Sequence, residues 1–131
     1  RLGTDSHAPI DVLGEARALE LDERLRSHRR GNHAAADLLE MASRNDHRSL
    51  GWDDAGTSVV GARADLVTLA LDSVRAAGAP TYSAVEVAVF AASAADVTHV
   101  VVDGRVVVAD RRHATIDVPA ELQASIARLF E

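Results

Sequence analysis

An aspartate-glycine pair inside a valine-rich segment is the feature that most constrains the fold of this chain. Asp103 and Gly104 interrupt residues 97–109, where valine dominates on both sides of the pair. A two-residue Asp-Gly connection predicts a β-hairpin, because both central residues of the tight turn need positive φ. Residues 100–102 are consecutive valines rather than alternating apolar and polar residues, which predicts that both faces of this strand are covered.

The first residues of the chain predict a strand followed at once by a helix. Residues 2–5 have the pattern of the end of a buried strand, and Pro9 precedes a helical pattern over residues 10–30. If that strand belongs to a β/α barrel, Asp5 lies at the mouth where such barrels keep their chemistry. The alternative is a helix-entry role, in which the Asp5 side chain accepts a backbone N–H bond. Ser6 is also a competent cap, which would leave Asp5 free.

Two helices are expected before residue 50. The first presents near-helically spaced positions along one side, and its last turn gathers basic residues that predict a solvated helix end. Gly31 is predicted to end this helix and Asn32 to cap the second. The positions concerned are Leu13, Arg17, Leu21 and Leu25 in the first helix, and Ala34, Leu38, Leu39 and Ala42 in the second.

The sequence changes near residue 50 from helical patterns to a stretch rich in glycine and aspartate, which predicts a domain boundary. A loop-rich stretch follows it, then a buried strand over residues 64–71 and a short buried helix over residues 83–93 capped by Ser83. Pro119 opens a last helix with an apolar stripe of Leu122, Ile126, Leu129 and Phe130. The expected organisation is therefore a unit over residues 1–49 and a second unit over residues 50–131.

Composition excludes several classes of function. The 131 residues carry 14 Lys and Arg against 20 Asp and Glu, and a net charge of −6 has the wrong sign for a protein that neutralises nucleic-acid phosphates. No apolar run reaches the length of about 18 residues that a membrane span needs. The absence of cysteine fits a cytoplasmic location. The chain starts at Arg1 without an initiator Met, which suggests the tail of a longer protein.

The chain lacks most local motifs of catalysis. Its six histidines form neither an H-x-H pair nor an H-E-x-x-H helix, and phosphate-binding glycine loops and G-x-S-x-G are absent. Among the histidines, His7 is the best placed for a functional role, because it lies two residues beyond Asp5.

Three separated segments together resemble the C-terminal part of metal-dependent amidohydrolases. Residues 2–7 (LGTDSH) are similar to the eighth barrel strand with its family aspartate. Residues 61–67 (GARADLV) are similar to the entry into the small β-sandwich, and residues 99–110 (HVVVDGRVVVAD) to its closing hairpin. The helix pattern beginning Glu15-Ala16-Arg17 is similar to that of formimidoylglutamate deiminases. One departure is Arg111, which follows Asp110 where relatives often have glycine.

The resemblance implies an α/β fold: the end of a (β/α)8 TIM-type barrel, then strands of a small β-sandwich and a C-terminal helix. It implies a zinc-dependent iminohydrolase that converts N-formimidoyl-L-glutamate and water to N-formyl-L-glutamate and ammonia in histidine degradation. Asp5 would be both metal ligand and proton shuttle, with the histidine ligands upstream of this chain. His7 would contact the substrate or a neighbouring group, and the complete protein would be a cytoplasmic homodimer.

Two alternatives stay open at this point. The same fold could deaminate an aminated purine, a pyrimidine or a cyclic amide. The 131-residue chain by itself could instead be a catalytically inert structural segment, because one aspartate cannot hold a catalytic zinc that takes three or more protein ligands.

Overall fold

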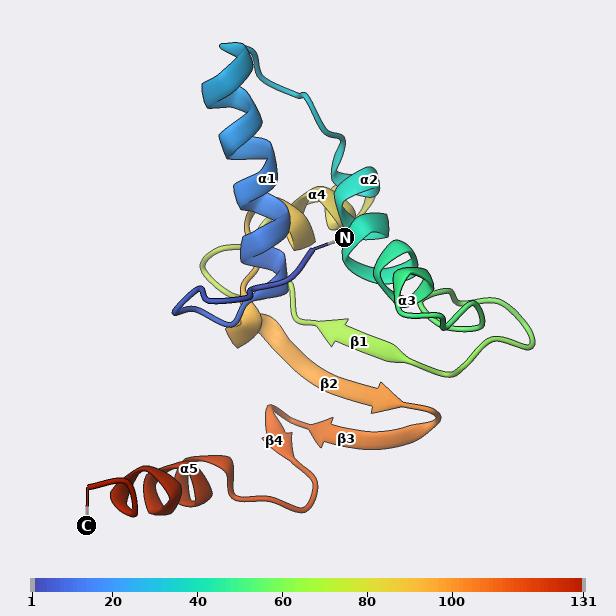
Figure 1. The fold of residues 1–131 in the computed structure, drawn as a ribbon. Coiled ribbons are helices and arrows are strands. Elements are labelled where there is room, and N and C mark those ends of the chain that lie inside the picture. Colours follow the sequence, from blue (N-terminus) through green and yellow to red (C-terminus); the bar gives the residue numbers. More distant parts are fainter. Residues whose placement is uncertain (1, 131) are drawn as a thin grey trace.

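The computed structural model describes residues 2–130 and consists of helices gathered beside one antiparallel sheet (Figure 1). The sheet has the order β1-β2-β3-β4, and the helices α1 to α4 lie on the β1 side while α5 lies beyond β4. No helix within residues 2–130 is long and apolar enough to cross a membrane. The strands are β1 (Leu66–Leu69), β2 (Val97–Val102), β3 (Arg105–Ala109) and β4 (Arg112–His113). The helices are α1 (Val12–Ser27), α2 (Ala35–Glu40), α3 (Asp46–Ser49), α4 (Ala84–Phe90) and α5 (Val118–Ala127).

The predicted hairpin is confirmed. Strands β2 and β3 pair antiparallel with Val102 opposite Arg105, and the turn between them has φ of 50° at Asp103 and 75° at Gly104. A second tight turn joins β3 to β4, with φ of 49° at Asp110 and 64° at Arg111. Local turn chemistry therefore fixes the register of this part of the sheet.

The expectation that both faces of the strand over residues 97–102 are covered is wrong, because no residue of β2 is fully buried and Val102 is 49% exposed. The side chains of Leu66, Val67, Val102 and Val106 are about half exposed or more. The physical reason is that, within residues 2–130, the four strands form one sheet and no second sheet packs on it. A second layer of the expected sandwich is therefore not seen within residues 2–130.

The expected strand at residues 2–5 is also absent. Strand structure requires a hydrogen-bonded neighbour, and no described segment pairs with these residues. The backbone N–H of Leu2 instead donates to Asp46 Oδ1 at 2.9 Å, and the Leu2 side chain packs against the helical core. The start of the chain is therefore held by α3 in place of a barrel sheet.

Helix α1 is shorter than predicted and buries a different face. It ends before His28, whose φ of 54° is left-handed, rather than at Gly31. Ala16 and Glu20 are fully buried, whereas Leu21 and Leu25 are 52% and 77% exposed. Of the four positions expected along one side of this helix, Leu13 and Arg17 are partly buried while Leu21 and Leu25 are exposed, so the face that packs is centred on Ala16 and Glu20 instead.

Two predicted caps are replaced by other contacts. Asn32 does not cap α2, whose N-cap position is Ala34; the Asn32 side-chain amide donates to the carbonyl of Arg29. Ser83 forms no side-chain cap on α4, because a 3-10 turn over Thr81–Ser83 leads directly into that helix.

The C-terminal helix forms as predicted, but its apolar stripe is not packed. Asp117 caps α5 by accepting from the Ala120 N–H at 3.3 Å. All four stripe residues are exposed, with Leu129 and Phe130 at 79% and 86%. In Figure 1 this helix stands apart from the other helices at the far end of the sheet.

The hydrophobic core lies between α1, α2 and α4. Its buried members are Ala16, Ala35, Leu38 and Val89, with partly buried neighbours at Leu2, Leu19 and Met41. Arg17 of α1 ties the first helix to the fourth, because its guanidinium donates to the carbonyl of Val89 at 3.2 Å and to that of Ala92 at 2.6 Å. A π-helical turn over Met41–Asn45 joins α2 to α3 beside this core.

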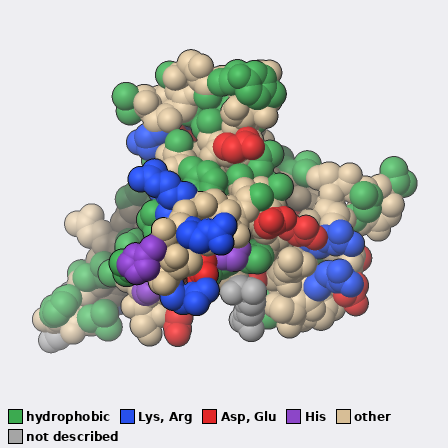
Figure 2. Space-filling model, turned by 90° about the horizontal axis from the view of Figure 1, so that it is seen from above, with side chains coloured by type: hydrophobic (Ala, Val, Ile, Leu, Met, Phe, Trp, Pro, Cys, Tyr) green, Lys and Arg blue, Asp and Glu red, His purple; other side chains and the backbone are tan. Residues whose placement is uncertain are grey.

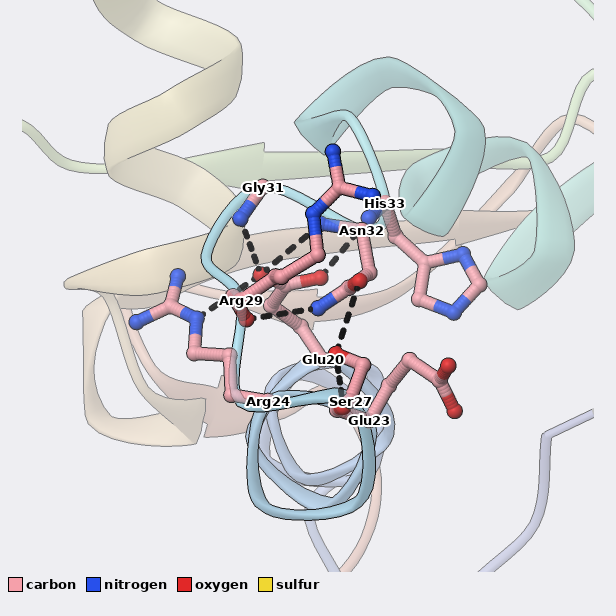
Figure 3. A network of polar contacts seen from close by, with 8 residues as sticks. All are labelled: Glu20, Glu23, Arg24, Ser27, Arg29, Gly31, Asn32 and His33. Carbon is pink, nitrogen blue, oxygen red and sulfur yellow. Dashed lines mark hydrogen bonds and ion pairs between the residues drawn. The ribbon is translucent and has the colours of Figure 1, made fainter.

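A buried glutamate organises the loop between α1 and α2 (Figure 3). Glu20 is fully buried and accepts from Arg24 Nε at 2.7 Å. It also accepts three consecutive backbone N–H groups, from Gly31 at 2.9 Å, Asn32 at 3.3 Å and His33 at 2.7 Å. These donors favour the charged carboxylate and lower the pKa of Glu20 to about 2.

The basic end of α1 is largely solvated, as the sequence predicts. Viewed from above, Arg and His side chains gather near the middle of the face in Figure 2. Arg29 and Arg30 are exposed, and Arg26 pairs with Glu23 at the surface. Arg24 differs, because it belongs to the buried Glu20 network.

We expect acid to weaken this fold through Glu20. Its pKa in the folded chain, about 2, lies below its ordinary value of 4.5, so the stabilisation is fully present above pH 4.5 and disappears as the pH falls toward 2. Urea unfolding between pH 2.5 and 6 should show a shallower pH dependence for Glu20→Gln than for the parent. The control is Glu86→Gln, at an exposed position on α4, which should retain the parental slope. Equal slopes for parent and Glu20→Gln would contradict this expectation.

Candidate functional site

Asp5 lies in a tight turn just ahead of α1. The N–H of His7 donates to the carbonyl of Thr4 at 2.7 Å and closes the turn. Asp5 has a φ of 39°, a conformation that Asp and Asn tolerate better than most other residues with a side chain. Its side chain is exposed. The turn therefore presents a carboxylate and an imidazole two residues apart.

A different aspartate performs the capping role that was the alternative for Asp5. Asp11 Oδ1 accepts from the N–H of Leu13 at 3.0 Å and of Gly14 at 3.1 Å. These are two of the N–H groups that the start of α1 leaves without a helical partner. Neither Asp5 nor Ser6 caps the helix, so the carboxylate of Asp5 is not engaged in holding α1.

His7 is bound to the first turn of α1. Its Nδ1 lies 2.7 Å from Glu15 Oε1, and the side chains are 63% and 17% exposed respectively. The hydrogen bond to Glu15 and the charge of that carboxylate raise the pKa of His7 above its ordinary value. Sequence reasoning missed Glu15 as a partner, because the two residues face each other only through the path of the loop between them.

The start of the Asp5 segment is anchored at Leu2. Its backbone N–H is held by Asp46, and its side chain packs against the same cluster as Met41. Asp46 is 44 positions away in sequence, and no local signal identifies it. The Asp5 turn thus lies between two anchors, one at Leu2 and one at Glu15.

Two other histidines have neighbours other than Asp5. His47 Nδ1 is 2.8 Å from the Ser43 carbonyl, and His99 Nε2 is 3.7 Å from Asp110. A hollow of about 630 Å³ beside β4 and the start of α5 is lined by residues 111–119 and includes none of the Asp5 turn. Within residues 2–130, no three His, Asp or Glu side chains come close enough to hold a metal ion.

The fold of this chain is also found in a zinc-bound enzyme of known structure. A crystal structure of an adenosine deaminase from Xanthomonas campestris with bound zinc matches it with a TM-score of 0.84 and 25% identity. The match covers 95% of this chain and 28% of that one. The sequence of residues 1–107 matches the amidohydrolase family, and the chain belongs to that family.

Two curated relatives carry different printed activities. A 5-methylthioadenosine/S-adenosylhomocysteine deaminase of Desulfitobacterium hafniense is 33% identical over 118 residues, which are 88% of this chain and 26% of that protein. A formimidoylglutamate deiminase of Pseudomonas aeruginosa is 34% identical over 120 residues, which are 86% of this chain and 26% of that protein. The chain spans about a quarter of the length of these relatives.

Two substitutions should separate the roles of the two aspartates. Asp11→Ala should destabilise the chain by about 1 kcal/mol, because it removes the N-cap of α1. Asp5→Gly, chosen because glycine tolerates the left-handed φ, should change stability by no more than about 0.5 kcal/mol, since the carboxylate caps nothing. Urea denaturation followed by circular dichroism measures both effects. Equal destabilisation by the two substitutions would show that Asp5 is a structural residue.

Proposed function

We propose that this chain is the C-terminal part of a zinc-dependent hydrolase that releases ammonia from a small-molecule substrate. The observation that carries the proposal is the carboxylate of Asp5, exposed in the turn ahead of α1 and relieved of capping by Asp11. Family membership supports it, and so does the zinc bound in the structurally similar adenosine deaminase. We also propose that the complete protein is a homodimer of the cytoplasm.

The residues of this chain fit part of a zinc site. Carboxylate oxygen is an ordinary zinc ligand, and a catalytic zinc takes three protein ligands and keeps one open position. Asp5 would supply one of these ligands. Because no metal-holding group of three forms within residues 2–130, the others would come from residues outside this chain.

The chemistry of Asp5 follows from its carboxylate. Bound zinc would lower the pKa of a water molecule toward neutrality. Asp5 would help to hold the metal, accept the proton released when water attacks the substrate carbon, and pass that proton to the leaving nitrogen. The carbon gains oxygen, its C–N bond breaks, and the nitrogen leaves as ammonia.

Two substrate classes are supported by separate observations. An adenine nucleoside is supported by the Desulfitobacterium relative and by the structurally similar adenosine deaminase. N-formimidoyl-L-glutamate is supported by the Pseudomonas relative and by the helix pattern from Glu15 to Arg30. We place the nucleoside first, because the structure gives several residues of that pattern structural roles: Arg17 binds α4, and Glu20 with Arg24 holds a loop.

An ammonia-release assay on the protein encoded by the complete gene distinguishes these substrates. The panel is 5-methylthioadenosine, S-adenosylhomocysteine, adenosine, formimidoylglutamate and guanine, each compared by kcat/KM. We expect the highest value for an adenine nucleoside. Fastest turnover of formimidoylglutamate would select the second substrate, and no ammonia from any of the five would refute a deaminase of either class.

Asp5→Asn in that complete protein should remove activity without unfolding it. We expect kcat/KM to fall by roughly 10²–10⁴-fold, because the proton acceptor is lost, and the zinc content per chain to drop. Zinc is measured by elemental analysis after dialysis. The matched control is Asp22→Asn, at an exposed position on α1, which should keep parental activity and zinc. If Asp5→Asn kept the parental zinc content and activity, Asp5 would be neither the metal ligand nor the proton acceptor.

A further inference from the structure

The carboxylate that holds His7 has no role in the chemistry proposed above. Glu15 is only 17% exposed and lies within 2.7 Å of His7 Nδ1, whereas the His7 ring is 63% exposed. A carboxylate this enclosed needs a hydrogen-bond donor, because burying it without one is costly. His7 is therefore a specific partner of Glu15.

This contact decides which ring nitrogen of His7 is available to a ligand. An ionised carboxylate only accepts hydrogen bonds, so Nδ1 must carry the hydrogen that Glu15 receives. Nε2 is then the nitrogen left over, and no hydrogen bond to it is found within residues 2–130. A histidine held by carboxylate at one nitrogen and open at the other has its tautomer and ring orientation fixed in advance.

The same contact fixes the turn that carries Asp5. The turn is closed by the bond from His7 N–H to the Thr4 carbonyl. Binding of the His7 ring to α1 therefore restrains the backbone on both sides of Asp5. Without Glu15, one end of this exposed turn would have only its own backbone bond to hold it.

We propose that Glu15 is a positioning residue that holds the His7 ring by Nδ1, so that Nε2 binds a hydrogen-bonding amine or hydroxyl group of the substrate beside Asp5. The proposal rests on the proposed function of Asp5.

The first test is spectroscopic and needs no activity. In the protein from the complete gene, labelled with ¹⁵N-histidine, the ring signals of His7 are assigned by their loss in His7→Gln. At a pH where the ring is neutral, the parent and Glu15→Gln should show hydrogen on Nδ1, because the amide oxygen of glutamine also accepts a hydrogen bond. Glu15→Ala should shift His7 toward the other tautomer. Unchanged His7 signals in Glu15→Ala would overturn the proposal.

The second test is a double-mutant cycle on turnover of the best substrate. Glu15→Ala and His7→Gln should each raise KM by about tenfold, the effect of one lost hydrogen bond, with kcat changed less than about threefold. Glu15→Gln should stay within about threefold of the parent, and the double variant should match His7→Gln alone. A full additional loss from Glu15→Ala in the His7→Gln background would refute action through His7.

Failure of the proposed function gives a different result from failure of this inference. A protein that releases no ammonia and retains no zinc would refute the proposed function and, with it, the substrate contact of Nε2. The ring signals would still decide whether Glu15 sets the orientation of His7.

Discussion

The rest of the helical layer depends on one buried carboxylate. Glu20 sits with no solvent exposure on the inner face of α1 and collects three successive N–H groups of the loop that leads to α2. Those donors would otherwise be unpaired at the point where the chain reverses direction, and Arg24 balances the charge. The loop geometry that results sets α2 against α1, so that Ala35 and Leu38 close the core with Ala16. The charged side chain of Glu20 thus specifies how the apolar faces of α1 and α2 pack against each other.

The Asp5 turn inherits its position from that layer. Behind α2, the π-helical turn leads into α3, where Asp46 holds the backbone of Leu2. On the other side of the turn, Asp11 starts α1 and Glu15 holds the His7 ring. In the first two contacts an aspartate side chain accepts from backbone N–H groups, and in the third a glutamate side chain binds the His7 ring. The exposed carboxylate of Asp5 is therefore carried on a short segment whose two ends are both attached to the same helical core.

Sequence patterns predict the elements whose cause is local. The Asp103-Gly104 turn and the helices follow from residues within a few positions, and both are found. Predictions that need a distant partner do less well. Residues 2–5 form no strand because no other strand within residues 2–130 lies beside them to pair with. The valines of the sheet stay exposed because no second layer covers them within the same residues. The core also includes Val89, far along the chain from α1, so the burial of α1 could not be deduced from its own leucines. The domain boundary near residue 50 stays a prediction.

In the candidate site, too, the local features could be predicted from the sequence and the long-range contacts could not. The resemblance to a family motif makes Asp5 a candidate, and the structure adds that Asp11, not Asp5, caps α1. Arg17 is another residue whose contacts lie far away in the sequence, because it joins α1 to the end of α4. Its guanidinium donates to two backbone carbonyls at and just beyond the end of α4, so two bonds from one planar group join the two helices. The Asp5 turn lies before the first residue of α1, and the loop held by Glu20 follows its last residue. A shift of the end of α4 along α1 would therefore have to lengthen or break at least one of the two Arg17 bonds.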